Sequence, residues 1–268
     1  MAQGCVGIIG VGNMGEALLA ALIASGQSAS SICFTEKREE RAAEISSRYG
    51  ATAKSLAEIA RDCQTILLVV KPQDLFDTLD QIKATGSSAG KSYISFVAGK
   101  TIASIESRLS GESSVIRVMP NTPALIGKGM AALSAGTHTT PADMKFALDF
   151  LRASGKAVEV PESLQDAVTA TSGSGPAYFF AFVEAMVNGA MALGLTREVA
   201  TELTVQTIYG AAGMLVESGK DATTLRENVT SPNGTTAAAL AHFNSAGLGQ
   251  IVADAMRAAS DRSAELSK

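Results

Sequence analysis

The feature that most constrains the fold is a glycine-rich turn near the start of the chain. In "VGIIGVGNMGEALLAALIASG", Gly10, Gly12 and Gly15 have the spacing G-x-G-x-x-G between an apolar run and a helical pattern. Here the first glycine makes a tight turn, the second lets the backbone approach a pyrophosphate, and the third lets helix and strand pack closely. Amide groups at the helix start then face the phosphates. The turn, with Asn13 and Met14, predicts a dinucleotide site; the alternative is a glycine-rich packing turn.

Strand-like and helical segments alternate over the first 160 residues. Short apolar runs such as "CVGIIG", "SICFTE", "TILLVV", "SYISFV" and "SVIRVM" are separated by amphipathic segments. Runs that are apolar on both faces are typical of parallel strands covered by helices. The pattern predicts a doubly wound, mostly parallel, Rossmann-type α/β sheet over residues 1–160. Further strands are expected at 129–135 and 156–160, with a helix at 142–153.

The sequence pattern changes after Pro161. Stretches rich in Ala, Leu and Met at 176–193 and 197–217 have helical spacing, and strand-like alternation ends. Residues 161–268 are therefore predicted to form a second, all-helical domain. These apolar helices would bury one another either in a dimer or in a monomeric bundle, and the pattern alone does not choose between the two.

Composition excludes several classes of function. The formal net charge is −4 with no basic cluster, which argues against nucleic acid as a partner. No apolar run is long enough to span a membrane, and the N-terminus does not have the pattern of a secretory signal. Cys5, Cys33 and Cys63 are scattered, without the spacing of a metal site or a disulfide framework. We expect a cytoplasmic protein with reduced cysteines and no metal.

The end of the second predicted strand, "FTEKREER", bears on the choice of nucleotide. Glu36 lies about twenty residues after the glycine turn, where an acid binds the ribose hydroxyls of NADH. Lys37 and Arg38 follow at once and could instead bind the 2′-phosphate of NADPH. A third interpretation is that these residues form the solvated first turn of a helix. The expected cofactor is NADPH, with NADH possible.

Three further stretches carry a family resemblance: "VVKPQ" (69–73), "RVMPNTPALIGKG" (117–129) and "TSGSGPAYFFAFVEAM" (171–186). Together with "NVTSPNGTTAAAL" near the C-terminus, they resemble the pyrroline-5-carboxylate reductases in order and spacing. The resemblance covers essentially the whole chain. Members of that family reduce Δ1-pyrroline-5-carboxylate to L-proline with NADPH or NADH, the last step of proline biosynthesis, and the resemblance implies the same activity here.

The resemblance also implies which residues surround the nucleotide. Besides the stretch from Gly10 to Gly15, they are Val70, Lys71, Pro72, Ala98, Gly99 and Asn121. The pair Ala98 and Gly99 would lie beside the nicotinamide, and Asn121 would brace the same cleft. A purely structural turn at Asn121 is the alternative. The side chain of Lys71 could face either cofactor or solvent.

The turn "SPNGTT" is the expected substrate site. A carboxylate is well bound by backbone amides at the start of a helix. The expected substrate-binding residues are Ser231, Asn233, Gly234, Thr235 and Thr236. Asn233 and Gly234 tolerate positive φ, and Thr235 or Thr236 could cap the helix. The family usually has Ser-Pro-Gly-Gly here, with Asn233 replacing the first glycine; the alternative is an ordinary capping turn.

Thr169 is the candidate for the proton transfer. It matches a family position whose hydroxyl lies near the ring nitrogen, as a hydrogen-bond partner or relay; the alternative is an ordinary helix-interior threonine. His138 and His242 fall in no motif and are expected at the surface or at a helix cap. The resemblance further implies a homodimer with interlocked helical halves that contribute jointly to a site, and in some members a ring of dimers.

Two other functions compete with this interpretation. The β-hydroxyacid dehydrogenases also begin with a strand and G-x-G-x-M-G, but they need a catalytic lysine in the first long helix of the second domain. No lysine occurs between Lys156 and Lys220. A non-catalytic NADP(H) sensor is the second alternative, and the "SPNGTT" turn argues against it because a sensor has no need for a second anion site.

Overall fold

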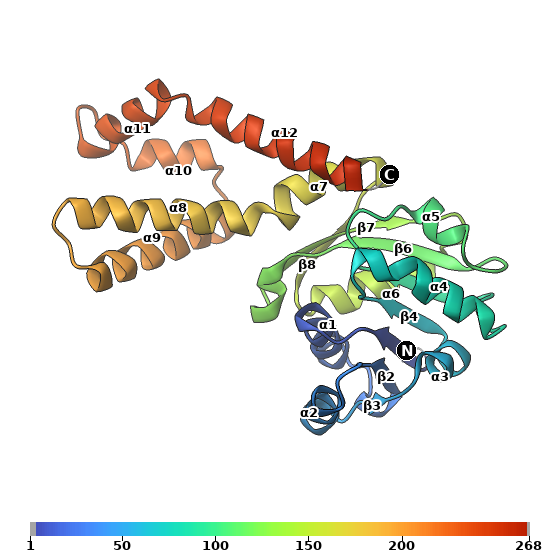
Figure 1. The fold of residues 1–268 in the computed structure, drawn as a ribbon. Coiled ribbons are helices and arrows are strands. Elements are labelled where there is room, and N and C mark those ends of the chain that lie inside the picture. Colours follow the sequence, from blue (N-terminus) through green and yellow to red (C-terminus); the bar gives the residue numbers. More distant parts are fainter. Residues whose placement is uncertain (1–3, 267–268) are drawn as a thin grey trace. The chain divides into compact units, whose positions relative to one another are not determined.

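The computed structural model describes residues 4–266, which contain an eight-stranded sheet and many helices (Figure 1). The strands are β1 (Val6–Ile9), β2 (Ile32–Thr35), β3 (Thr52–Ala53), β4 (Thr65–Leu68), β5 (Ser92–Ser95), β6 (Ser114–Met119), β7 (Gly129–Ala135) and β8 (Gly155–Glu159). The α-helices are α1 (Asn13–Ala24), α2 (Glu39–Tyr49), α3 (Leu56–Asp62), α4 (Leu75–Ala84), α5 (Ile102–Glu106), α6 (Pro141–Arg152), α7 (Gln165–Val168), α8 (Gly175–Ala192), α9 (Arg197–Glu217), α10 (Ala222–Asn228), α11 (Thr235–Ser245) and α12 (Leu248–Leu266).

The sheet has the order β3-β2-β1-β4-β5-β6-β7-β8. Neighbouring strands pair in parallel, except for the antiparallel pair β6 and β7. The chain builds outward from β1 through β2 to β3 and then returns to the other side of β1 with β4. In such sheets, ligands bind at the carboxyl ends of the strands beside this point of reversal. The predicted doubly wound, mostly parallel fold is confirmed.

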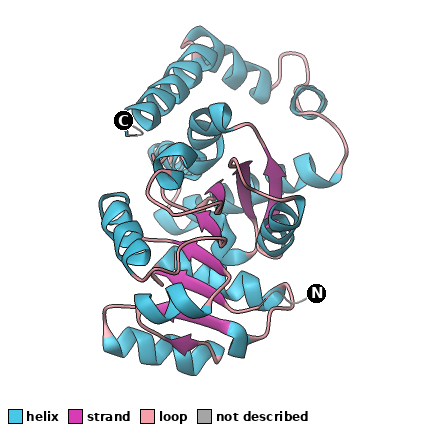
Figure 2. Ribbon diagram, turned by 90° about the vertical axis from the view of Figure 1, so that its right-hand side faces the viewer, coloured by secondary structure: helices cyan, strands magenta, loops and turns pink. Residues whose placement is uncertain are grey.

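The central strands β1, β2, β4, β5 and β6 are buried on both faces because their side chains alternate between two cores. On β1, Val6 and Ile8 belong to one hydrophobic cluster and Ile9 to the other. The first cluster includes side chains of α1, α2 and α6, and the second includes side chains of α3, α4 and α5. Figure 2 shows the strands side by side with helices on both sides of the sheet. This double burial explains the near-continuous apolar runs in the sequence.

The chain divides into two compact units. The first unit runs to Ser174 and also contains the chain from Ala259 onward; the second is Gly175–Ala258. The boundary predicted after residue 160 lies earlier than this division. The offset has a physical cause, since α7 still packs with the first unit: the buried Gln165 donates a hydrogen bond to the Ser134 hydroxyl over 2.8 Å.

The second unit is entirely helical, as predicted for this half. Within it α8 packs against α9, and the rings of Phe182 and Phe243 lie 6.3 Å apart between centroids. Many large apolar side chains of this unit are exposed, among them Phe179, Phe180 and Tyr209. An exposed apolar surface of this kind is typical of an interface between proteins. None of the helices in residues 4–266 is both long and apolar enough to cross a membrane.

Candidate active site

The glycine turn connects β1 to α1, and its three glycines occupy different environments. Gly10 has φ of 98°, and a Cβ there would lie 2.9 Å from the Val69 carbonyl oxygen. A Cβ on Gly15 would collide with the Gly10 carbonyl oxygen, so helix and strand need both glycines in order to pack. A Cβ on Gly12 would meet nothing within 4 Å. The packing of the chain therefore leaves room at Gly12 for a ligand to approach the backbone.

The start of α1 completes the site for a pyrophosphate. Gly12 is the N-cap of α1 and has no side chain that could bind the first helical amides. Asn13 is exposed and Met14 is half-buried beside it. The first N–H groups of α1 are thus free of a side-chain cap and carry the partial positive charge of the helix start. The turn fits the diphosphate of a dinucleotide.

Glu36, the acidic residue after β2, is ionised and bonded to Arg38. The Glu36 carboxylate accepts hydrogen bonds from the Arg38 backbone N–H (3.0 Å) and from its guanidinium Nε (3.3 Å). Partial burial raises the pKa of Glu36, but the hydrogen bonds from Arg38 outweigh it and hold the pKa below its ordinary value. Lys37 and Arg38 are exposed. An acceptor for ribose hydroxyls and two cations for a phosphate therefore occupy the same loop, so this geometry leaves the choice of nucleotide open.

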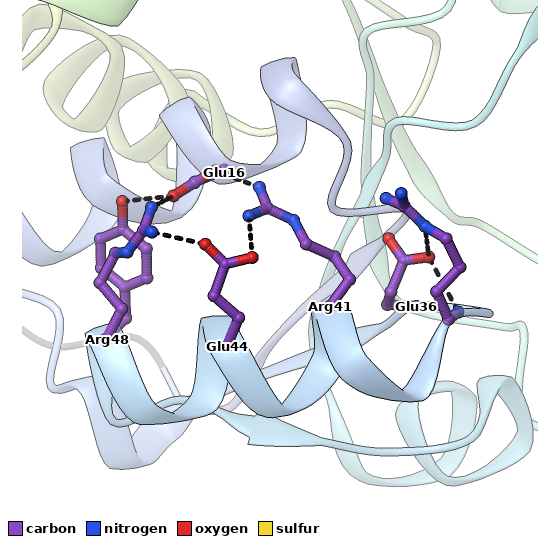
Figure 3. A network of polar contacts seen from close by, with 7 residues as sticks. Glu16, Glu36, Arg41, Glu44 and Arg48 are labelled. Carbon is purple, nitrogen blue, oxygen red and sulfur yellow. Dashed lines mark hydrogen bonds and ion pairs between the residues drawn. The ribbon is translucent and has the colours of Figure 1, made fainter.

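A network of ion pairs joins α1 to α2 near the loop that contains Glu36 (Figure 3). The Glu16 carboxylate of α1 accepts hydrogen bonds from Arg41, Arg48 and the Tyr49 hydroxyl of α2. Figure 3 shows Arg41 and Arg48 on either side of Glu44, with Glu16 reaching toward both arginines. Burial raises the pKa of Glu16, but the bonds from Tyr49 and the two arginines lower it overall.

This network was not predicted from the sequence. An acidic residue in the first turn of a helix is common, and so are Arg and Glu side chains along one face of a solvated helix. The sequence therefore does not distinguish these residues from ordinary surface charges. Its effect is local: by fixing α2 to the first turn of α1, it holds the Glu36–Arg38 loop next to the glycine turn.

Two further loops reach the same edge of the sheet. Val70, Lys71 and Pro72 follow β4, with Lys71 and Pro72 exposed and Val70 half-buried. Ala98 and Gly99 follow β5; Ala98 is exposed and Gly99 is buried with φ of 69°. Because β2, β1, β4 and β5 are consecutive and parallel, their carboxyl ends share one edge. The structure thus brings the predicted nucleotide residues together along this edge.

Gly99 also contacts the end of the chain. A Cβ there would lie 2.9 Å from the Cβ and 3.0 Å from the carbonyl oxygen of Leu266, the last described residue of α12. Both residues belong to the first unit. The loop beside the expected nicotinamide position therefore packs against the C-terminal helix.

Asn121 is held on both sides by the protein. Its Nδ2 donates to the Ser172 carbonyl oxygen (3.2 Å) and to the Ser172 hydroxyl (3.3 Å), and its Oδ1 accepts from the Met130 N–H (2.8 Å). The side chain therefore ties the start of β7 to the segment Thr169–Gly173. That segment is a π-helical turn, a rare conformation often found at functional sites.

Thr169 begins the π-helical turn and is partly buried. Its hydroxyl donates to the Gln165 carbonyl oxygen over 2.8 Å, the bond expected of a threonine inside a helix. The hydroxyl oxygen keeps lone pairs with which it could accept a proton or a hydrogen bond. His138 and His242 are exposed, as predicted.

The turn at 231–236 opens α11 in the second unit. Asn233 has φ of 59°, and the Gly234 N–H donates to the Ser231 carbonyl oxygen over 3.0 Å. One expectation here was wrong: Gly234 is itself the N-cap, so neither Thr235 nor Thr236 caps the helix. Gly234 has φ of −79°, so of the two residues that tolerate positive φ, Asn233 is the one that adopts it. A Cβ on Gly234 would lie 2.5 Å from the Ser231 hydroxyl oxygen, which explains a small residue at the cap.

The comparisons with known proteins point to one family. Residues 162–266 match the family model described as pyrroline-5-carboxylate reductase dimerisation. The chain is 39% identical to the pyrroline-5-carboxylate reductase of Corynebacterium melassecola, over 98% of both chains. It is 40% identical to that of Pseudomonas aeruginosa, over 98% of this chain and 97% of the relative. The chain belongs to the pyrroline-5-carboxylate reductase family.

Solved structures of other pyrroline-5-carboxylate reductases have the same fold. The Coxiella burnetii structure superposes with a TM-score of 0.93 at 34% identity and covers 99% of both chains. The Plasmodium falciparum structure, which has NADP bound, gives a TM-score of 0.87 at 29% identity over 100% of both chains. Residues 5–99 match a further family model, described as NADP oxidoreductase, coenzyme F420-dependent. With the open space at Gly12, these findings support an NAD(P)-type nucleotide as the cofactor.

Membership also gives a reason for the exposed apolar helices. The matched dimerisation model covers α8 to α12, where Phe179, Phe180 and Tyr209 are exposed. The match supports assembly of this reductase into an oligomer, and a monomeric bundle would leave these rings in water.

An ion pair between the buried Arg117 and the partly exposed Glu162 was also missed by sequence reasoning. The Glu162 carboxylate accepts from the Arg117 guanidinium (3.1 Å) and from the Ile102 N–H (2.8 Å), so it links β6 to the start of α5. The available signal was an arginine inside the otherwise apolar run "SVIRVM", since a buried strand tolerates a charge only when it is paired.

Proposed function

We propose that this chain is a pyrroline-5-carboxylate reductase that transfers hydride from NADPH or NADH to the C=N bond of Δ1-pyrroline-5-carboxylate, giving L-proline in the last step of proline biosynthesis. The observation that carries the proposal is similarity to reductases of that name over almost the full length of the chain. The glycine turn supports it, because Gly12 leaves the backbone open to the diphosphate of a dinucleotide. We propose the cytoplasm as the location of the enzyme.

The nucleotide residues have defined tasks in this proposal. The amides of Gly12 to Gly15 would bind the pyrophosphate, and the Glu36–Arg38 loop would bind the adenosine ribose. Val70 to Pro72, Ala98 and Gly99 would line the nicotinamide half. The nicotinamide supplies a hydride to the imine carbon when it is bound. Asn121 would act indirectly, because its amide is bonded to Ser172 and Met130 and keeps the π-helical turn in place.

The turn at 231–236 would bind the substrate carboxylate. Backbone N–H groups of Thr235 and Thr236 lie at the start of α11, and the hydroxyl groups of Ser231 and Thr236 add donors. Asn233 supports this role through its left-handed backbone, which turns the chain into the helix.

The reaction requires little acid–base catalysis from the protein. A protonated cyclic imine is already an electrophile, so the site must mainly orient the substrate and exclude water. We propose Thr169 as a hydrogen-bond partner of the ring nitrogen. Its own proton is donated to Gln165, which makes the oxygen an acceptor for an N–H.

We further propose a homodimer as the basic assembly, with rings of dimers as the larger alternative. The exposed rings of α8 and α9 support it. Analytical ultracentrifugation would measure the assembly, and a monomer at micromolar concentration would contradict the proposal.

The proposed activity is tested by following oxidation of NADPH and NADH with pyrroline-5-carboxylate and without substrate, and reduction of NADP+ and NAD+ with a β-hydroxyacid. We expect turnover only with the imine acid. Turnover with the hydroxyacid, or nucleotide binding with no turnover on any substrate, would refute it.

A further inference from the structure

Three cysteine thiols meet at the amino ends of three neighbouring strands. Cys5 directly precedes β1, Cys33 is the second residue of β2, and Cys63 lies between α3 and β4. The Cys5 Sγ lies 2.6 Å from the Cys63 Sγ and 3.5 Å from the Cys33 Sγ. All three sulfur atoms lie within 4.8 Å of one another. Residues that are scattered in the sequence thus form one cluster, because β2, β1 and β4 are adjacent and parallel.

The cluster has the donor set of a soft metal ion. Thiolate ligands select Zn²⁺, Cu⁺ or iron–sulfur centres over hard cations. With metal–sulfur bonds of about 2.3 Å, two sulfurs on one ion lie at most about 4.6 Å apart. In tetrahedral or trigonal coordination two sulfurs lie about 3.8–4.0 Å apart, so an ion would move the Cys5 and Cys63 Sγ atoms, which are 2.6 Å apart, away from each other by roughly 1 Å. Cys33 and Cys63 are buried, while Cys5 is half-buried and gives an ion access from solvent.

We propose that Cys5, Cys33 and Cys63 together bind one soft cation, Zn²⁺ or Cu⁺, at the sheet edge opposite the nucleotide turn. Three sulfur–metal bonds form as three S–H protons leave to solvent, and no electron is transferred. With Zn²⁺ a water completes the fourth position, whereas Cu⁺ is satisfied by three thiolates.

Two lysines are placed to offset the negative charge of three thiolates. The buried Lys91 ammonium donates to the carbonyl oxygens of Cys63 (2.5 Å) and Arg61 (3.4 Å). The second is Lys54, whose backbone N–H donates to the carbonyl oxygen of Phe34, the residue after Cys33, over 2.9 Å. Its ammonium also pairs with Asp62 over 2.7 Å. Cations beside a sulfur cluster favour the thiolate form that a metal requires.

A metal accounts for the cluster better than a disulfide does. A disulfide between Cys5 and Cys63 would leave Cys33 without a role, whereas one ion uses all three sulfurs.

The site would act on stability rather than on catalysis. The cluster lies at the amino ends of β1, β2 and β4, and the glycine turn follows the carboxyl end of β1. An ion there would join three strands of the sheet, and binding only to the folded chain raises its stability.

The test is titration of the fully reduced full-length protein with Zn²⁺, and anaerobically with Cu⁺, each in competition with a chromophoric chelator. We expect one equivalent bound in at least one arm. Because loss of a supporting hydrogen bond alone typically weakens metal binding by 10–100-fold, each single Cys→Ser variant should weaken it by at least about 100-fold. The control is the variant His138→Ala with His242→Ala, which removes the two exposed imidazoles and should bind as the wild type does.

Folding of the variants is checked by NADPH binding and circular dichroism. If Cys33→Ser or Cys63→Ser fails to fold, Cys5→Ser at the half-exposed position still decides the matter. A second measurement is alkylation: bound metal should protect Cys5, and a chelator should restore its reactivity. Absence of stoichiometric binding, binding that survives the cysteine substitutions, or a Cys5–Cys63 disulfide in a protein that binds neither ion would each overturn the proposal.

Discussion

Helices α1 and α11 both begin after a glycine N-cap, Gly12 and Gly234 respectively. A Cβ on Gly12 would meet open space, whereas one on Gly234 would lie 2.5 Å from the Ser231 hydroxyl oxygen. Packing within the chain therefore disfavours a Cβ at Gly234 and leaves room for a Cβ, or for an approaching ligand, at Gly12. The comparison of the two helix starts shows that a glycine at an N-cap can indicate a ligand only where the atoms of the chain leave space beside it. The substrate role of the second turn must consequently be tested through its hydroxyl groups.

The largest expected effect comes from Gly15→Ala. The new Cβ would collide with the Gly10 carbonyl oxygen, which is backbone and cannot move aside cheaply. We expect the free energy of unfolding to fall by about 3 kcal/mol, measured by urea denaturation. Wild-type stability in this variant would show that the helix start is not packed as described.

Gly12→Ala is the matched variant and should separate packing from binding. Its Cβ has room, and alanine is a poorer N-cap than glycine, so we expect the free energy of unfolding to fall by no more than about 1 kcal/mol, well below the loss for Gly15→Ala. NADPH binding should weaken about 100-fold, because a small displacement of the diphosphate is costly. Calorimetric titration measures the affinity. Unchanged binding would remove the main reason for placing the pyrophosphate at this turn.

The double variant Ser231→Ala with Thr236→Ala tests the second helix start. Loss of hydroxyl donors to a carboxylate should raise the KM for pyrroline-5-carboxylate about 10-fold, while NADPH binding stays the same. Steady-state kinetics give the KM, and Ser28→Ala, at an exposed serine of the first unit, serves as the control. Wild-type kinetics would reject the substrate role of the turn.

The variant Lys37→Ala with Arg38→Ala tests the choice between nucleotides. These exposed cations should contribute up to about 5-fold to NADPH affinity and nothing to NADH affinity. Kd values for both nucleotides measure the difference. Equal losses would mean that neither cation contacts the 2′-phosphate, and Glu36 would then favour NADH.

The smallest expected effect is the pH dependence of stability that arises from the Glu16 network between α1 and α2. The pKa of Glu16 is lower in the folded chain than in the unfolded chain, so its ionised form stabilises the fold above about pH 4.3. This contribution is lost as the pH falls through the folded pKa. Glu16→Gln should lower stability at neutral pH by less than about 1 kcal/mol and make the loss between about pH 5 and about pH 3 shallower. Parallel curves for the two proteins would refute the pKa shift.

Much of the first unit could be predicted because its central strands are buried on both faces. Each long strand was visible as an apolar run, and the glycine turn placed the nucleotide edge. The two-residue strand β3 was not predicted, since Thr52 and Ala53 are too few to show a period. The π-helical turn at Thr169–Gly173 was not predicted either, because its conformation depends on packing and on the bonds from Asn121 rather than on local residue preference.

Contacts between distant residues were the least predictable. The cysteines are 28 and 30 positions apart along the chain, and only the strand order brings them together. At the second helix start, the sequence indicated a turn correctly, but Gly234 rather than a threonine became the cap. Hydroxyl side chains are good caps, yet the tight turn to Ser231 fixes which residue occupies that position.

The contact between Gly99 and Leu266 has a practical consequence for anyone producing this enzyme. Because Leu266 lies against a loop that we expect to hold the nicotinamide, an affinity tag on the C-terminal side of α12 should raise the KM for the nucleotide relative to the untagged protein. Cleavable fusions compared before and after removal would reveal such an artefact.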